Sequence, residues 1–291
     1  MNTASAPSAV TDDARRFRPL LLLLVPILLF LAIFFFWPLL SMLVRSVSDP
    51  EPTLAHYERL LAEPVYLEVM FVTFQIALYT TLGTLLLGYP LAYYLSGLST
   101  RMAALLMTIV IVPYFTSVLV RTYAWMVLLG SEGVVNQVLT GLGLVDTPLR
   151  LMYNRFGVLL GMIYILLPYM VLSLYSVMRG IDRSLLRAAD SLGATRFTSF
   201  RRIFLPLSMP GIAAGCLLVF ILSLGFFITP ALMGSQQDAM ISMIIEQQVE
   251  TYFDWGFAAA LSAVLLVVTL LAFALYDRLV GLENLFRSRS P

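Results

Sequence analysis

Six long runs of apolar residues dominate the sequence and constrain its fold more than any other feature. A membrane-spanning helix needs about 20 consecutive, mostly apolar residues, and each run is long enough. Apolar residues make up 60% of the 291-residue chain and charged residues only 12%, well below the charged fraction of an ordinary soluble domain. We therefore predict an all-α, polytopic membrane protein with six transmembrane helices. The predicted spans are Leu20–Val44, Val69–Leu95, Met102–Leu129, Phe156–Val177, Leu207–Leu232 and Trp255–Tyr276.

The six spans divide the chain into a short N-terminal tail, a transmembrane domain and a short C-terminal tail. The boundaries that we predict are residues 1–19, 20–281 and 282–291. Three arginines precede the first span, as in a signal peptide, but its apolar run is too long for one and no small-residue cleavage site follows it. We therefore interpret it as a retained helix. The third span is long for a single crossing, so we expect an interfacial helix or a bend beyond Val120.

Arginine placement predicts the orientation in the membrane, because cytoplasmic loops carry an excess of Lys and Arg. With the N-terminus inside, thirteen arginines fall in cytoplasmic segments and five in outer segments, and most acidic residues fall outside. We therefore predict that both termini are cytoplasmic. The long polar segment from Arg179 to Pro206 then faces the cytoplasm as well.

The side-chain types that the sequence lacks exclude several kinds of chemistry. All 18 basic residues are arginine, and a P-loop needs a lysine on the nucleotide phosphates, so we expect no ordinary ATP site. The single histidine, His56, and the single cysteine, Cys216, cannot form a disulfide or a His/Cys metal cluster within one chain. The spans offer neither a Ser–His pair nor paired aspartates for an intramembrane protease. We expect no enzyme activity, metal or cofactor on this chain, and the net charge of +1 does not indicate nucleic-acid binding.

The spans carry few charges, which bears on the class of transporter. A proton-coupled secondary transporter is expected to hold a relay of carboxylates or histidines inside the membrane. The sequence has no such relay, although polar residues such as Gln75 keep a secondary transporter or channel for a small organic solute as the alternative. Prolines and glycines in most spans are typical either of ordinary kinks or of a moving bundle around a pathway.

The segment 179–206 interrupts the apolar sequence with arginines and short helical patterns. Ser184 is a plausible N-cap for a helix that ends at Gly193, a residue suited to a left-handed C-terminal conformation. The apolar positions of this helix follow the i, i+3, i+4, i+7 spacing of one face: Leu185, Ala188, Ala189 and Leu192. Two alanines in the middle of the face allow another surface to approach closely. After a bend, a second short helix is expected over Thr198–Phe204.

The pattern of this segment alone supports two interpretations equally. The first is an amphipathic interfacial helix whose arginines bind anionic lipid headgroups. The second is a docking surface for another protein. A membrane protein that is driven from outside the bilayer needs such a surface.

Three features of the segment recur in one known family. They are the pair Ala188-Ala189, Gly193 three residues after Asp190, and Ile203-x-Leu205-Pro206. Together they resemble the EAA loop of bacterial binding-protein-dependent ABC importer permeases, in which the loop forms a coupling helix that fits a cleft in the ATPase subunit. One residue departs from the pattern, because Arg187 stands where the family has a glutamate. The coupling residues that the resemblance implies are Leu185, Arg187, Ala188, Ala189, Leu192, Gly193, Ala194, Ile203, Leu205 and Pro206.

The resemblance extends over nearly the whole chain. Residues 113–125, 129–136 and 161–168 are similar to the spermidine/putrescine branch of the family. This branch implies a small charged solute, such as a polyamine or a related amine or amino-acid-like compound. The C-terminal half departs from it at Phe226, where polyamine permeases usually have a glutamate.

The family also implies partners and a location. We expect a dimer of ABC ATPase subunits that binds ATP and Mg²⁺, a periplasmic solute-binding protein, and the lipid bilayer of the bacterial inner membrane. Six spans form half of a pathway, so we also expect a second permease subunit, either a paralogue or a second copy of this chain.

Candidate pathway residues lie near the outer ends of the third and fifth spans and in the segment that follows. They are Tyr114, Phe115, Arg121, Tyr123, Trp125, Phe226, Phe227, Thr229 and Glu246. We expect the first aromatic residues to surround Arg121, either as an interfacial belt or as a gate whose rings bind a cationic solute. Glu246 would meet the binding protein or an ammonium group of the solute, or would lie on a solvated loop face.

Overall fold

Every regular element in residues 24–49 and 51–280, the part of the chain that the computed structural model describes, is a helix. Six helical stretches are long and apolar enough to cross a membrane, which confirms the predicted all-α fold with six transmembrane helices. They are Leu24–Ser48, Pro64–Gly97, Val118–Gly141, Arg155–Met178, Arg196–Leu224 and Trp255–Arg278. The predicted tails, 1–19 and 282–291, lie outside the described residues.

Four long helices form most of the bundle. They are α4 (Pro64–Gly97), α8 (Arg155–Met178), α11 (Leu205–Leu224) and α14 (Trp255–Val280). The first crossing contains a π-helical turn, η1 (Ala32–Phe36), and continues into α2 (Trp37–Ser48).

The third crossing, which we predicted over Met102–Leu129 with an interfacial helix or a bend beyond Val120, is interrupted before that residue. It consists of α5 (Thr100–Ile111), a 3₁₀ turn η2 (Val112–Phe115) and α6 (Val118–Leu129). The break follows Pro113, which has no backbone N–H to donate to the helix, and the chain leaves the helical conformation at Thr116 (ψ 151°) and Ser117 (ψ 139°). The chain therefore bends before Val120 and not beyond it, and α6 runs unbroken from Val118 to Leu129. After α6 the apolar stretch turns at Gly130 into α7 (Val134–Gly141).

The fifth crossing also differs from its predicted range, Leu207–Leu232. Its helix ends at Leu224, and the chain turns through Gly225 into a separate short helix, α12 (Ile228–Met233). A 3₁₀ turn, η4 (Gln236–Asp238), and α13 (Ile241–Glu250) follow before α14 begins.

The centre of the bundle is the contact between α4, α8 and α11. Met170 and Leu174 of α8 are fully buried there. Helices in lipid associate mainly through close van der Waals packing, which small residues permit. A Cβ atom at Gly211 of α11 would lie 3.0 Å from Val177 Cβ and 3.3 Å from the backbone oxygen of Ser173, so glycine allows α8 and α11 to approach.

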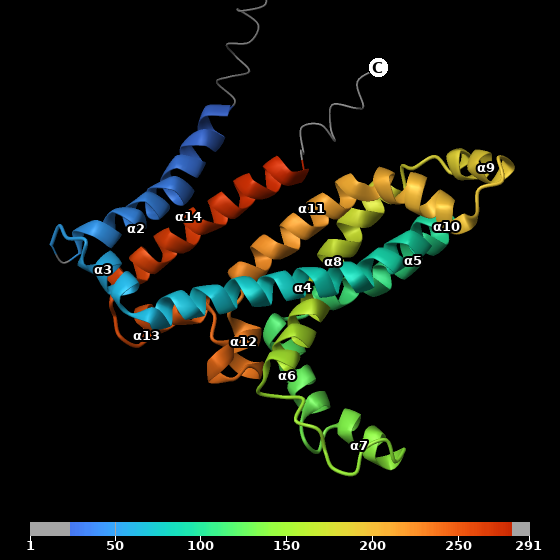
Figure 1. Cartoon of the computed structure of the whole chain (residues 1–291). Coiled ribbons are helices and arrows are strands. Elements are labelled where there is room, and N and C mark those ends of the chain that lie inside the picture. The colour runs from blue at the N-terminus through green and yellow to red at the C-terminus, as the bar shows by residue number, and fades with distance from the viewer. Residues whose placement is uncertain (1–23, 50, 281–291) are drawn as a thin grey trace, which may run out of the picture.

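Figure 1 shows how the remaining elements are placed around this core. Helix α14 pairs with α2, and its first turn also packs against the start of α4, where the ring centroids of Phe257 and Tyr66 lie 5.0 Å apart. The helices α7, α12 and α13, together with α3 (Ala55–Ala62), lie at one end of the molecule. The opposite end carries α9 (Ser184–Ser191) and α10 (Arg196–Ser199), and the described ends of the first and last spans point the same way.

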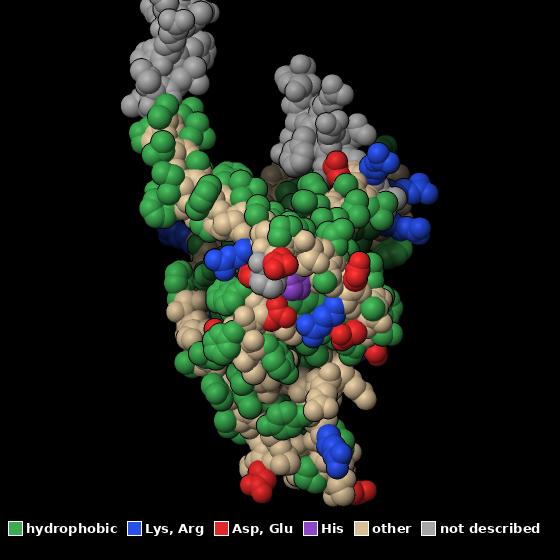
Figure 2. Space-filling view, turned by 90° about the vertical axis from the view of Figure 1, so that its left-hand side faces the viewer, with side chains coloured by type: hydrophobic (Ala, Val, Ile, Leu, Met, Phe, Trp, Pro, Cys, Tyr) green, Lys and Arg blue, Asp and Glu red, His purple; other side chains and the backbone are tan. Residues whose placement is uncertain are grey.

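The first span has no buried side chain over its most apolar window. Figure 2 shows its apolar surface above a group of charged side chains around His56. In that group Arg59 forms a local ion pair with Glu63 (3.2 Å) and a second one with Asp254 (3.4 Å), which connects α3 to the residue before α14.

A polar network at the same end connects α4, α8 and η4. Arg155 Nε donates to Asp238 Oδ1 (3.0 Å) and its Nη1 donates to Gln75 Oε1 (3.1 Å). The other carboxylate oxygen of Asp238 accepts from the backbone N–H of Ser235 (3.2 Å) and from its hydroxyl. Asp238 is almost completely buried, so the network satisfies a charge inside the protein.

Candidate functional site

The predicted helix in the segment 179–206 is present as α9, but its N-terminal cap differs from the prediction. The helix begins at Ser184, and the capping acceptor is Asp182, which receives hydrogen bonds from the Ser184 backbone N–H (2.8 Å) and hydroxyl (2.6 Å). These two hydrogen bonds hold the pKa of the Asp182 carboxyl below its ordinary value. The carboxylate therefore stays ionised and caps α9 at neutral pH.

The apolar face of α9 is largely open to solvent. Leu185 is 47% exposed and Leu192 is 89% exposed, and Ala188 between them is exposed as well. Ala189 is half-buried. Arg187, also exposed, forms no ion pair with any described residue. A membrane protein that leaves such a face uncovered at one end offers it to a partner or to lipid headgroups.

The C-terminus of α9 is a Schellman motif. This motif needs a residue with a left-handed backbone at a fixed distance after the last helical turn, which accounts for the position of Gly193 four residues after Ala189. Gly193 has φ +84°, a left-handed conformation that favours glycine. Its N–H donates to the Asp190 oxygen (3.0 Å), and the N–H of Ala194 donates to the Ala189 oxygen (3.0 Å). The predicted left-handed exit at Gly193 is confirmed.

The second predicted helix, Thr198–Phe204, is not a separate element. The Thr195 hydroxyl caps α10 by accepting from the N–H of Thr198 (3.3 Å), and a π-helical stretch, η3 (Phe200–Phe204), then runs directly into α11. Ile203, Leu205 and Pro206 therefore occupy the first turns of the fifth crossing. Pro206 has no backbone N–H, and the π-helical stretch η3 directly before it is the kind of local adjustment that accommodates a proline within a transmembrane helix.

Hydrogen bonds from two arginines attach this loop to the corner between α4 and α5. Arg179 donates to the backbone oxygen of Leu98 (2.7 Å) and to Thr100 Oγ1 (2.9 Å), and Arg183 donates to Ser96 Oγ (3.2 Å). At the far end of α9 the Ser199 hydroxyl donates to Asp190 (3.1 Å). The loop is therefore joined to α4, α5 and α11, so that a force on α9 reaches all three.

Of the four aromatic residues that we expected around Arg121, two are mostly exposed and two pack against α8. Arg121 is buried, with only 7% of its surface exposed, and does not lie at a lipid-facing boundary. Phe115 and Tyr123 are mostly exposed, and Tyr123, two residues after Arg121, lies on the opposite face of α6. The other two candidates pack against α8, with ring centroids 5.5 Å apart for Tyr114–Tyr169 and 5.3 Å apart for Trp125–Tyr164.

Of the candidates from the C-terminal half, one contacts the third crossing. The hydroxyls of Thr229, on α12, and Thr122, on α6, lie 3.2 Å apart in a buried hydrogen bond. Phe226 packs against the core, and its backbone oxygen accepts from the Ser242 hydroxyl (2.8 Å). Phe227 is 41% exposed, and Glu246 is exposed on α13. We did not predict Thr122 as a candidate residue, because the only indication of it in the sequence was its position next to Arg121.

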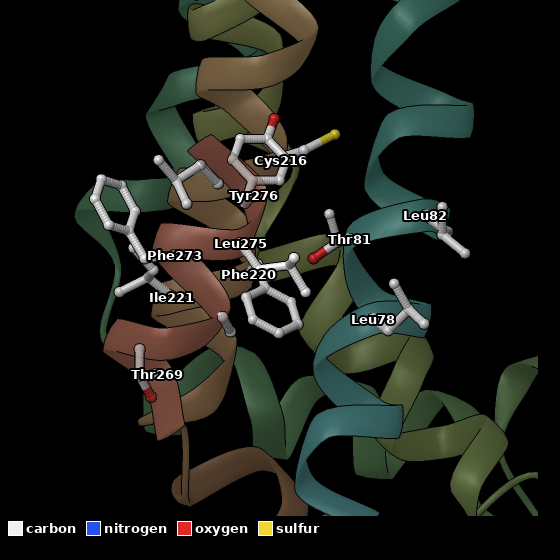
Figure 3. A pocket seen from close by; sticks show the side chains of 12 residues that line it. Leu78, Thr81, Leu82, Cys216, Phe220, Ile221, Thr269, Phe273, Leu275 and Tyr276 are labelled. Atoms are coloured by element: carbon white, nitrogen blue, oxygen red, sulfur yellow. The ribbon is translucent and has the colours of Figure 1, made fainter. Parts of the chain in front are cut away.

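A separate apolar cavity of about 340 Å³ lies between α4, α11 and α14. Figure 3 shows Leu78 and Leu82 of α4 on one side and Phe220 and Tyr276, from α11 and α14, on the other. Cys216 also lines it, and the Tyr276 hydroxyl donates to the Ala213 backbone oxygen (2.8 Å). Because its lining offers almost no free polar group, this cavity is not suited to a charged solute.

Comparison with known proteins identifies the family. Residues 84–281 match the family described as "Binding-protein-dependent transport system inner membrane component". The chain belongs to this family. The matched region contains α9, Arg121 and α11. Because the family is an inner membrane component and the described chain has six candidate spans, the protein is a multi-pass inner-membrane protein.

The inner membrane component is similar to several curated relatives. It is 42% identical over 232 residues to the spermidine/putrescine transport system permease protein PotB of Escherichia coli (strain K12), covering 80% of this chain and 84% of the relative. The corresponding protein of Haemophilus influenzae is 35% identical over 264 residues, with 90% of each chain covered. The putative 2-aminoethylphosphonate transport system permease protein PhnU of Salmonella typhimurium is 28% identical over 271 residues, covering 90% of this chain and 93% of that one.

A solved structure has the same fold. A chain of a bacterial alginate ABC transporter, in complex with an alginate-bound periplasmic protein, superposes with a TM-score of 0.76 at 20% identity. The match covers 93% of this chain and 96% of that one. At this identity the likeness supports the fold of an ABC importer permease and says nothing about the solute.

Proposed function

We propose that this chain is one of two permease subunits of an ABC importer for a small amine-bearing solute, either a polyamine or a related amino-acid-like compound. A periplasmic binding protein delivers the solute to the end of the bundle that carries α7, α12 and α13. Separate ATPase subunits bind ATP and Mg²⁺ and contact α9 at the opposite end. The similarity to the spermidine/putrescine permeases, at 42% identity, supports the choice of solute.

The observation that carries this proposal is the position of α9. The helix projects from one end of the bundle with Leu185, Ala188 and Leu192 uncovered, and two arginines that precede it in the loop, Arg179 and Arg183, join it to the transmembrane helices. A partner that pulls on α9 can therefore move α4, α5 and α11. Alternating access follows if nucleotide binding to the partner favours one packing of these helices over another.

The distribution of arginines supports the orientation. Six arginines lie between positions 179 and 202, at the same end as α9. The positive-inside rule places this end in the cytoplasm. Both termini are then cytoplasmic, and α7, α12 and α13 face the periplasm.

Uptake into proteoliposomes tests the proposal. The complete transporter would be reconstituted with its binding protein on the α13 side, and radiolabelled putrescine and spermidine would serve as probes. We expect uptake that requires ATP on the α9 side and the binding protein on the other. Uptake of either amine under a proton gradient without ATP would instead indicate a secondary transporter. If neither amine is taken up but the binding protein still stimulates ATP hydrolysis, polyamines are rejected as the solute and the ATP-driven mechanism is kept.

A further inference from the structure

A polar cavity of about 390 Å³ lies between α3, the start of α4, α13 and the turn before α14. Its polar lining residues are Arg59, Tyr66, Gln247, Gln248, Tyr252 and Asp254. It shares no lining residue with α6 or α12, which carry Arg121 and Thr229. Ligand sites in proteins usually have volumes of about 300–1,000 Å³ and a few convergent polar groups. The cavity therefore has the size and the polarity of a site for a small polar molecule.

Gln248 brings an unpaired amide to this cavity. Only 6% of the surface of Gln248 is exposed, and its side chain forms no hydrogen bond with any described residue. Buried polar side chains in native proteins nearly always have a partner, because an unpaired buried polar group costs free energy. Since Gln248 lines the cavity, the partner of its amide must be a molecule that enters the cavity, either water or a ligand.

The cavity is built by one face of α13 and by the turn that follows this helix. Ile244, Gln247 and Gln248 line it at the i, i+3 and i+4 positions of α13. Asp254 then caps α14, because its Oδ1 accepts from the backbone N–H of Phe257 (2.9 Å). The cap fixes the carboxylate, and Oδ2 of Asp254 is left for the cavity and for Arg59.

The charges around the cavity favour a cation. Among the described residues that line it, Arg59 is the only cation, and it is paired with Glu63 (3.2 Å) and Asp254 (3.4 Å). Two carboxylates against one guanidinium leave one net negative charge. The contact between Arg59 and Asp254 is also longer than the roughly 2.7–2.9 Å of a strong charge-assisted hydrogen bond, so Asp254 Oδ2 retains capacity to accept another donor.

We propose that this cavity binds the ammonium group of a small organic amine, at a site separate from Arg121 and Thr229. An ammonium group has three N–H donors and no acceptor, and the cavity offers it the carbonyl oxygen of the Gln248 amide and Oδ2 of Asp254. The exposed ring of Tyr252 covers the rest of the amine. The site goes beyond the proposed function, because it binds an amine without ATP and without the binding protein.

Photolabelling tests the site. Membranes that contain the complete transporter, without ATP or binding protein, would be irradiated with a putrescine that carries a diazirine on one carbon. Mass spectrometry of the digested chain is expected to find the label in residues 59–66 and 244–254. An excess of putrescine should displace it. The diol 1,4-butanediol has hydroxyls in place of the ammonium groups and should not compete.

Three variants test the residues that bind the amine. Gln248→Leu removes the amide at similar volume, and Asp254→Asn removes the charge and keeps the acceptor for Phe257. Each should raise the putrescine concentration for half-displacement about tenfold, the loss expected for a hydrogen bond to a charged group. Gln248→Glu adds a negative charge and should lower that concentration, which a purely structural role of residue 248 would not produce. Glu58→Gln, an exposed acid of α3 that does not line the cavity, is the control and should change it less than about twofold.

Four results would contradict the proposal. They are absence of label from both segments, equal displacement by the diol, equal effects of Glu58→Gln and Asp254→Asn, and an unchanged half-displacement in Gln248→Leu. If that last variant instead lowers association with the binding protein, the cavity takes a side chain of that protein and not a free amine. Labelling is measured without ATP, so a failure of ATP-driven uptake would leave these results intact.

Discussion

Arg179 Nη1 lies 2.7 Å from the backbone oxygen of Leu98, which connects the start of the α9 loop to the last carbonyls of α4. The same guanidinium reaches Thr100 Oγ1 at 2.9 Å, on the first turn of α5. The C-terminal carbonyls of a helix have no intrahelical donors and carry partial negative charge, so an arginine is suited to this position. A movement of α9 is therefore passed to two transmembrane helices through one side chain.

Arg179→Met should uncouple the transporter without detaching its ATPase. The exposed face of α9 stays intact, so the ATPase subunits should still co-purify with the chain. Loss of charge-assisted hydrogen bonds at a partly exposed site should lower ATP-dependent uptake about five- to tenfold. Arg187→Met, which removes an exposed arginine without a described ion-pair partner, provides the comparison for loss of charge alone. Equal effects of the two variants would argue against transmission through Leu98.

Gly193 should tolerate only residues that accept a left-handed backbone. A Cβ at this position would meet no atom within 4 Å, so the constraint is the φ of +84° and not the available space. Gly193→Asn should retain most ATPase association, whereas Gly193→Val should lose about tenfold or more, since a branched residue pays roughly 1–2 kcal/mol or more there. The measurement is the amount of ATPase recovered per permease. Similar recovery for both variants would show that the Schellman motif is not needed for docking.

The network of Arg155, Gln75 and Asp238 should contribute to stability and not to coupling. Asp238→Asn leaves Arg155 without its ion pair and should cost about 1–3 kcal/mol, with the lower part of this range favoured because Arg155 is partly exposed. The thermal midpoint of the purified complex in detergent should fall by several degrees, roughly 2–4 °C for each kcal/mol lost. Asp146→Asn, in an exposed loop, is the control and should leave the midpoint unchanged. An unchanged midpoint for Asp238→Asn would mean that the network is dispensable.

The sequence was sufficient to predict the six spans, the helix now seen as α9 and the left-handed exit at Gly193. These features depend on local patterns of apolar residues, alanines and glycine. The cap at Asp182 was missed, although it is local, because Ser184 is an equally good capping residue by type.

Other features depend on residues far apart in the chain and could not be predicted. The burial of Arg121 is one, because α12 packs against α6 through Thr122 and Thr229, which are 107 positions apart. The partners of Arg155 are 80 and 83 positions away. A helical pattern specifies which face of α6 is apolar, but it does not specify which element covers that face.

The proposed mechanism depends on a contact between α9 and the ATPase, and site-directed cross-linking tests this contact most directly. Cys216 is the single cysteine of the chain, so Cys216→Ala provides a cysteine-free background in which Ala188→Cys is the sole attachment point. A maleimide–benzophenone reagent attached there, in membranes that contain the active transporter, should give an adduct with the ATPase subunit. Val127→Cys, on the exposed face of α6, should give none. If Ala188→Cys in an active transporter yields adducts with lipid alone, α9 is an interfacial helix and does not bind the ATPase.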